Sequence, residues 1–113
     1  MKQPNLGKSH HVYVIELKPS LLGKERITEA NPGYRYREDR PLLYVGMTGR
    51  TPGIRYAQHL RGYKASKYTR TNCVRLRPDL YDDLNPMSRE EAVSMEVNLA
   101  ERLRKKGFAV WQN

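Results

Sequence analysis

The sequence contains little cysteine and no long apolar run. Its 113 residues include a single cysteine, Cys73. No internal disulfide or multi-cysteine zinc site can therefore form, which excludes zinc fingers and disulfide-stapled secreted folds. We interpret Cys73 as a small buried hydrophobic residue. No stretch of about 18 apolar residues is present, and the opening residues MKQPNLGKSHH lack the apolar segment of a signal peptide. We therefore expect one soluble, cytoplasmic domain over residues 1–113, with no membrane partner.

Acidic residues are absent from the middle of the chain, between Asp39 and Asp79. The same interval holds nine cations, which equal the net charge of +9 (21 basic minus 12 acidic residues): Arg40, Arg50, Arg55, Arg61, Lys64, Lys67, Arg70, Arg75 and Arg77. A run of charge usually marks a solvated face. Here the cations are interleaved with aromatic residues, the combination expected of a groove that binds phosphates and stacks on bases: Tyr44, Tyr56, Tyr63 and Tyr68. The sequence therefore predicts a nucleic-acid partner.

Three segments have the composition of β-strands. Residues 11–17 (HVYVIEL) are apolar and β-branched, which indicates a strand buried on both faces, and residues 42–46 (LLYVG) indicate a second strand. Residues 72–77 alternate imperfectly and predict a third. The segment between the first two strands, residues 18–41, is rich in proline and glycine and predicts a long, partly irregular excursion. Its length makes it a candidate functional loop.

Two segments carry helix signals. Thr51 and Pro52 fit the start of a helix that runs to about Arg61, with Gly62 as its stop. Ser88 and Glu91 form a capping box at the start of a longer helix, which is expected to run to Lys106 with Gly107 after it. Residues 108–111 form a short apolar ending that should pack back on the domain.

Glu96 lies on the expected core side of the long helix. It falls within a stripe of apolar residues at helical spacing, namely Ala92, Met95, Leu99 and Leu103. Burial of an unpaired, ionised carboxylate is prohibitively costly, so Glu96 must be neutral, pair with a cation, or bind a metal ion. A buried ion pair with an arginine and a site for a hard cation such as Mg²⁺ both fit.

Arg55 and His59 are four residues apart on the shorter helix and so share one face. Tyr56, Ala57 and Leu60 lie roughly opposite. One interpretation is a solvated polar face with a surface imidazole. The other is phosphoryl chemistry, which needs a cation for the phosphate oxygens and a neighbouring group that moves a proton near neutral pH.

Tyr13 and Tyr44 lie within the two apolar strands, where most tyrosines are core residues with a hydrogen-bonded hydroxyl. The order of motifs nevertheless resembles the GIY-YIG nuclease family. Val12 and Tyr13 stand where the family has its first tripeptide, with His11 in place of the first glycine. The tripeptide from Tyr44 to Gly46 closely copies the second.

The resemblance extends over residues 11–113. Arg55 and His59 match the family's Arg-x-x-x-His helix, and Glu96 matches its metal-binding glutamate. Asn113 could match a late asparagine of the family. The sequence departs from the family pattern at two further places. The segment between Tyr13 and Tyr44 is longer than usual, and Met47 stands where several members have lysine.

The resemblance implies an α/β fold of the α+β type, with a small three-stranded antiparallel sheet flanked by helices. It implies a divalent-metal-dependent endonuclease that hydrolyses DNA phosphodiester bonds with one Mg²⁺ or Mn²⁺ per site and no small-molecule cofactor. Glu96 would hold the metal ion, Tyr13 would act as general base, and Tyr44 would orient the water or phosphate. Arg55 would stabilise charge on the phosphorus, and His59 would relay a proton. The remaining residues would contact the nucleic acid: Arg61, Lys64, Lys67, Arg70 and Asn113.

Two other functions are compatible with the same residues. The first is a non-catalytic nucleic-acid-binding module for DNA or RNA, in which Glu96 is a structural ion-pair partner and both tyrosines belong to the core. The second is a basic protein-interaction adaptor, which leaves Arg55, His59 and Glu96 without a shared purpose.

Overall fold

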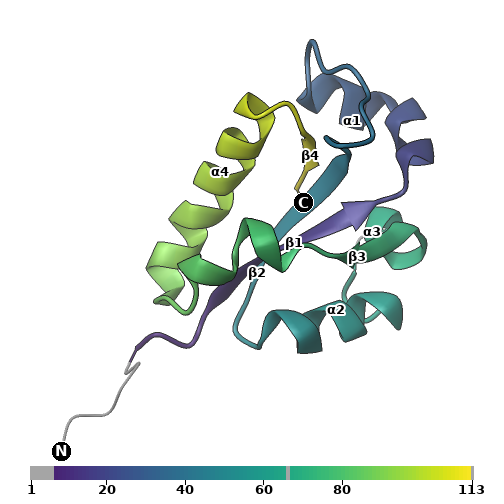
Figure 1. Ribbon diagram of the computed structural model, residues 1–113. Coiled ribbons are helices and arrows are strands. Elements are labelled where there is room, and N and C mark those ends of the chain that lie inside the picture. Colours follow the sequence, from purple (N-terminus) through teal and green to yellow (C-terminus); the bar gives the residue numbers. More distant parts are fainter. Residues whose placement is uncertain (1–6, 66, 113) are drawn as a thin grey trace, which may run out of the picture.

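Two apolar strands form the centre of the sheet. In the computed structural model, which describes residues 7–65 and 67–112, β1 (His11–Leu17) pairs antiparallel with β2 (Leu42–Thr48) (Figure 1). Tyr13 lies opposite Gly46, and Ile15 lies opposite Tyr44. Residues 12–15 are at most 1% exposed, which confirms a strand buried on both faces. Their burial explains why this strand is uniformly apolar and β-branched.

Two shorter strands complete a mixed sheet of order β3-β1-β2-β4. The third predicted strand is confirmed as β3 (Cys73–Leu76), which runs antiparallel to β1. The prediction of only three antiparallel strands is wrong in one respect, because β4 (Ala109–Trp111) adds a fourth strand parallel to β2. A strand of three residues is too short for its alternation to be read from sequence. The fold is therefore of the α+β class, as expected, with a mixed sheet.

Both predicted helices are present with the expected ends. The first is α2 (Pro52–Leu60), and the Thr51 hydroxyl accepts a hydrogen bond from the Ile54 N–H at its start. The second is α4 (Arg89–Lys105), and the reciprocal capping box of Ser88 and Glu91 is formed. Gly62 and Gly107 both have positive φ, which only glycine adopts without strain.

Several short helices were not predicted. The excursion begins with the 3₁₀ turn η1 (Pro19–Gly23) and the helix α1 (Glu25–Ala30). A further helix, α3 (Lys67–Asn72), precedes β3, and two 3₁₀ turns, η2 (Pro78–Leu80) and η3 (Asp82–Leu84), lead toward α4. Each spans six residues or fewer, which is less than the length over which helical periodicity becomes a clear signal.

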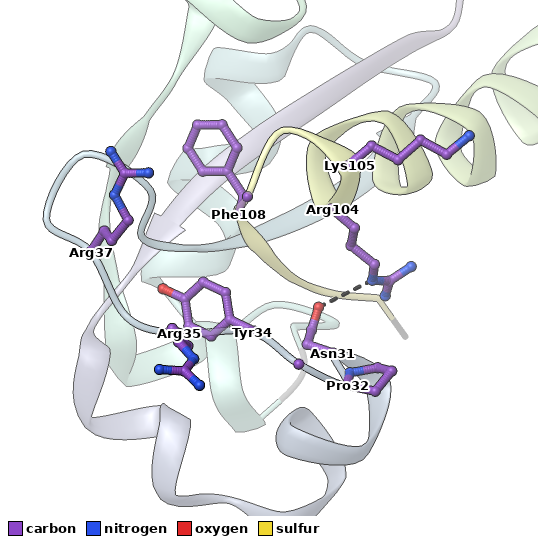
Figure 2. Close-up of a pocket in the computed structure, with 10 residues that line it drawn as sticks. Asn31, Pro32, Tyr34, Arg35, Arg37, Arg104, Lys105 and Phe108 are labelled. Carbon is purple, nitrogen blue, oxygen red and sulfur yellow. Dashed lines mark hydrogen bonds between the residues drawn. The ribbon is translucent and has the colours of Figure 1, made fainter.

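Asn31 connects the segment between β1 and β2 (residues 18–41, the excursion) to β4 through hydrogen bonds. Its side-chain oxygen accepts hydrogen bonds from the Val110 N–H (2.7 Å) and from Nε of Arg104 (3.1 Å), the latter drawn dashed in Figure 2. Its amide group donates to the carbonyls of Ile27 (2.7 Å) and Val110 (3.0 Å). All the polar groups of this buried side chain are thus satisfied. The excursion is therefore held against β4 by a specific contact and not only by apolar packing.

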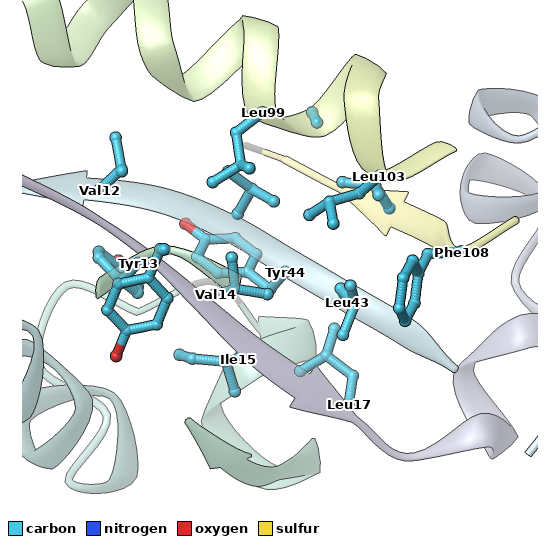
Figure 3. Packing of buried hydrophobic residues seen from close by; sticks show 14 of the residues in the cluster. Val12, Tyr13, Val14, Ile15, Leu17, Leu43, Tyr44, Leu99, Leu103 and Phe108 are labelled. Atoms are coloured by element: carbon cyan, nitrogen blue, oxygen red, sulfur yellow. The ribbon is translucent and has the colours of Figure 1, made fainter. Parts of the chain in front are cut away.

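The sheet carries helices on both faces. In Figure 3, Val12 lies on the side of α4 and Leu99, whereas Tyr13 and Ile15 point to the opposite side. The buried His59 of α2 contacts Tyr13, so α2 covers that second face. Of the helices in residues 7–65 and 67–112, none combines the length and apolarity required to cross a bilayer.

Candidate active site

A buried tyrosine and a buried histidine are joined by a hydrogen bond at the centre of the sheet. The Tyr13 hydroxyl lies 2.9 Å from Nε2 of His59. The other ring nitrogen of His59, Nδ1, lies 3.0 Å from the Thr69 hydroxyl on α3. Three elements, β1, α2 and α3, therefore meet at one imidazole. Thr69 was not a predicted site residue, since it follows His59 by ten positions with no motif to mark it.

Tyr44 completes a compact aromatic group with these two residues. Its ring centroid lies 6.2 Å from that of Tyr13 and 5.5 Å from that of His59. Gly46 provides the space for Tyr13, because a Cβ at this position would lie 2.5 Å from the Tyr13 hydroxyl oxygen and 3.0 Å from Cε2 of Tyr44. The glycine of the Tyr-Val-Gly tripeptide is therefore required by contact with both tyrosines.

Arg55 borders this group from α2. Its guanidinium donates hydrogen bonds to the backbone carbonyls of Tyr63 (2.9 Å) and Lys64 (2.8 Å), and to the side chain of Gln58 (3.1 Å). The same guanidinium lies close enough to the Tyr13 hydroxyl to lower its pKa, although the larger effects of burial and Tyr44 raise it. Arg55 thus fixes the turn after α2 and presents positive charge to Tyr13.

Burial sets the protonation states of the group. Burial first, and then the neighbouring Tyr44, raise the pKa of Tyr13 well above its ordinary value. Burial, with a smaller effect of the Arg55 charge, lowers the pKa of His59 to about 4. At neutral pH the pair therefore consists of a neutral phenol and a neutral imidazole.

The face of α2 that carries Arg55 and His59 is turned toward the sheet. His59 is fully buried, whereas Leu60 and Ile54 are 54% and 47% exposed. The interpretation of His59 as a surface imidazole on a solvated face is therefore wrong. The imidazole is buried there because Tyr13 and Thr69 satisfy both of its nitrogens.

Glu96 lies at the neighbouring edge of β2. β4 pairs with residues 42–44 only, and beyond them the Met47 backbone N–H lies close enough to the Glu96 carboxyl group to lower its pKa. Met47 follows Gly46, whose Cα packs against the Tyr13 hydroxyl. These contacts and standard bond lengths place the Glu96 carboxylate within roughly 10 Å of that hydroxyl.

The Glu96 carboxylate is half-buried and has no cationic partner within 4.0 Å among the residues that the structure describes. The alternative of a structural ion pair with an arginine is therefore not found in this part of the chain. Burial raises the carboxyl pKa, and the Met47 N–H opposes that rise in part. A half-buried carboxylate without an ion pair is suited to bind either a proton or a metal cation.

One carboxylate is a minimal protein ligand set for a metal ion. No group of three or more His, Cys, Asp or Glu side chains that could hold a metal occurs within the described residues. Mg²⁺ commonly takes one or two carboxylates and completes its octahedron with water and substrate phosphate. Glu96 therefore fits a Mg²⁺ or Mn²⁺ ion that is shared with a phosphate, and it does not fit a cage made by protein alone.

The predicted nucleic-acid contacts lie around the turn after α2. Arg61, Lys64 and Arg70 are exposed, and Arg70 packs its guanidinium against Gly62, where a Cβ would lie 3.0 Å from Nε. Lys67 begins α3, but its side chain lies outside the described part, as does Asn113. The three described cations thus surround the loop whose carbonyls Arg55 holds.

Scans of family models, curated proteins and solved structures each found no significant match for this chain.

Proposed function

We propose that the protein is a divalent-metal-dependent endonuclease of the GIY-YIG type that hydrolyses DNA phosphodiester bonds. The observation that carries the proposal is the hydrogen bond between Tyr13 and His59, with Tyr44 and Arg55 packed around it. These four residues are spread over 47 positions of the sequence and converge from two strands and one helix. Glu96, the fifth residue of the resemblance, approaches the same end of β2.

The proton chemistry follows from the protonation states. Tyr13 does not lose its proton unaided at neutral pH, because burial raises its pKa. It accepts a proton from a water molecule only if its own proton leaves at the same time. In the tautomer with hydrogen on Nδ1, which donates to Thr69, His59 offers Nε2 as the acceptor 2.9 Å away. The pair thus acts as a two-residue relay.

Arg55 and Glu96 would stabilise the negative charge of the reacting phosphate, Arg55 directly and Glu96 through a metal ion. Arg55 places a guanidinium beside Tyr13, where it stabilises negative charge that develops on a phosphate in the transition state. Glu96 would hold Mg²⁺ or Mn²⁺. When bound, that ion polarises a phosphate oxygen and stabilises the leaving oxygen. Arg61, Lys64, Lys67 and Arg70, with Asn113, would position the strand through its phosphates, which confers affinity without sequence preference.

The test is cleavage of end-labelled single-stranded and duplex DNA in Mg²⁺, Mn²⁺ or EDTA. Wild type is expected to cut only with a divalent cation. Glu96→Gln should bind DNA with unchanged affinity and fail to cut, because it removes a metal ligand and not the basic surface. Glu101→Gln, an exposed carboxylate on the same helix, is the matched control and should cut like wild type. Equal cutting by wild type and Glu96→Gln would overturn the proposal.

A second candidate is favoured by the burial of the cluster. Tyr13 is 1% exposed and His59 is 0% exposed, as expected of core residues in a non-catalytic nucleic-acid-binding module. In that case DNA or RNA binds at the same cations, and no divalent ion produces a cut. The cleavage assay separates the two functions directly.

A further inference from the structure

The excursion and the end of α4 enclose a pocket away from the tyrosine cluster. The pocket has a volume of about 500 Å³ and is formed by two segments, residues 31–37 and 104–108 (Figure 2). Ala109, which follows the second segment, pairs with Leu42 at the start of β2. Leu42 lies four residues before Gly46, or about 14 Å along the strand. The pocket is therefore distinct from the candidate active site.

The lining of the pocket is basic. It includes four cationic side chains, Arg35, Arg37, Arg104 and Lys105, and no acidic residue of the described chain. The only ion pair of these cations within the described residues joins Arg37 to Asp39, and both partners are more than half exposed. An ion pair in that position contributes little. The four charges are therefore available to an anion.

Aromatic residues line the pocket beside the cations. Tyr34 and Phe108 both contribute to its wall. The Tyr34 hydroxyl donates to the Arg40 carbonyl (2.7 Å), which fixes the ring. The Arg40 guanidinium lies over the Phe108 ring, 5.2 Å from the ring centroid, and this cation–π contact fixes the ring. The pocket therefore combines flat apolar surface with positive charge.

The pocket is also preformed. Arg104 uses two groups to hold its position, donating Nε to Asn31 (3.1 Å) and Nη2 to the Val110 carbonyl (3.1 Å). A guanidinium fixed in this way loses little side-chain entropy on binding an anion. The remaining Arg104 donors have no hydrogen-bond partner among the described residues.

We propose that this pocket binds one unpaired nucleotide of a single-stranded nucleic acid, with the base against Tyr34 and the adjacent phosphates on Arg35, Arg37 and Arg104. A nucleotide presents a flat ring and an anion together, and the volume falls within the range of pockets for small ligands. A paired base is stacked within its duplex and cannot enter. The proposal rests on a nucleic-acid partner, as does the proposed function, but not on cleavage.

The test measures binding in EDTA, so that the result is independent of any cutting. A labelled oligothymidylate and a blunt duplex are titrated by fluorescence anisotropy over a range of salt concentrations. Arg35→Gln/Arg37→Gln should lower the log-log salt slope for the single strand by about 1.4, at roughly 0.7 per phosphate contact, and leave the duplex slope unchanged. The control with equal charge loss is Arg26→Gln/Arg89→Gln, two exposed arginines outside the pocket, which should retain both slopes.

Tyr34→Leu should weaken single-strand binding roughly 5- to 150-fold through lost stacking, whereas Tyr34→Phe should retain the affinity. If Tyr34→Leu does not fold, the Arg35→Gln/Arg37→Gln variant still decides the question. Unchanged single-strand binding by this variant, or an equal loss in the Arg26→Gln/Arg89→Gln control, would overturn the proposal. Thermal stabilisation by thymidine monophosphate that depends on Arg35 and Arg37, with no effect of the pair on the oligonucleotide, would overturn it in favour of a free nucleotide.

Discussion

The Tyr13 hydroxyl and Nε2 of His59 lie 2.9 Å apart, and neither residue is more than 1% exposed. Water cannot replace either partner, so each satisfies a buried polar atom of the other. The hydrogen bond that would relay a proton therefore also contributes to stability, and a substitution at either residue affects both properties.

Tyr13→Phe tests this double role. The ring still packs, but Nε2 of His59 loses its partner, which should lower the free energy of unfolding by about 1–3 kcal/mol. The cleavage rate should fall at least 100-fold, in line with loss of a general base. Urea denaturation and single-turnover cleavage measure the two effects. Tyr36→Phe, at a position 50% exposed, is the control and should change neither. A stability equal to wild type would show that the hydrogen bond contributes nothing in solution.

The buried imidazole predicts a pH dependence of stability. The pKa of His59 is about 4 in the folded protein, below its ordinary value of 6.5. As the pH falls below 6.5, the unfolded chain binds a proton that the folded protein does not, so stability is lost between pH 6.5 and 4. Between pH 7 and 5 the loss from this residue should be about 2 kcal/mol.

Urea denaturation at several pH values, compared between wild type and His59→Gln, isolates that contribution. Every other ionisable group is common to the two proteins, so its contribution cancels in the comparison. The variant should show a shallower decline between pH 7 and 5. Parallel curves for the two proteins would mean that His59 is not buried as a neutral imidazole.

Gly46→Ala should be strongly disruptive. Its Cβ would lie 2.5 Å from the Tyr13 hydroxyl oxygen and 2.6 Å from Cζ, so Tyr13 must shift away from His59. We expect a loss of about 1–3 kcal/mol in the free energy of unfolding, as for overpacked cores. Gly53→Ala is the control, because nothing lies within 4 Å of its Cβ and the position is helical. That substitution should be neutral or stabilise by up to about 1 kcal/mol. A Gly46→Ala variant as stable as Gly53→Ala would contradict the packing described.

Asn31→Leu should detach the last strand. It removes all four hydrogen bonds of the side chain and leaves the Val110 N–H among unpaired buried groups, at about 1–3 kcal/mol for each such group. Trp111, the single tryptophan, reports on β4 through its fluorescence, which should shift to the red before global unfolding. Asn98→Leu on the exposed side of α4 is the control. Identical fluorescence in both variants would show that Asn31 does not hold β4.

The central strands and both longer helices could be predicted because their signals are local. β1 is a continuous apolar run, and α4 begins at a capping box whose two residues are three positions apart. The position of Glu96 was also predictable in part, since its place in an apolar stripe indicates partial burial.

The features that the sequence did not reveal depend on contacts between distant residues. β4 pairs with a strand more than 60 positions earlier, and Asn31 meets Val110 across 79 positions. The contacts of Arg55 could not be predicted for the same reason, because its hydrogen bonds to the backbone carbonyls of Tyr63 and Lys64 depend on the path of the loop. Every residue has a backbone carbonyl, so the amino-acid sequence does not show which carbonyl accepts a hydrogen bond.

The strand order has a consequence for motion. β1 and β2, which carry Tyr13 and Tyr44, are the two internal strands, and residues 12–15 and 42–45 are at most 6% exposed, so the amides of these residues should exchange with solvent hydrogen more slowly than those of the helices around them. Arg55 and His59 lie on α2, a helix of nine residues that can open locally. The candidate site therefore has one half in the buried centre of the sheet and one half on an element that can open locally. A rearrangement that would admit a phosphate to the Tyr13 hydroxyl, as the proposed nuclease requires, would therefore involve α2 and the turn that Arg55 holds.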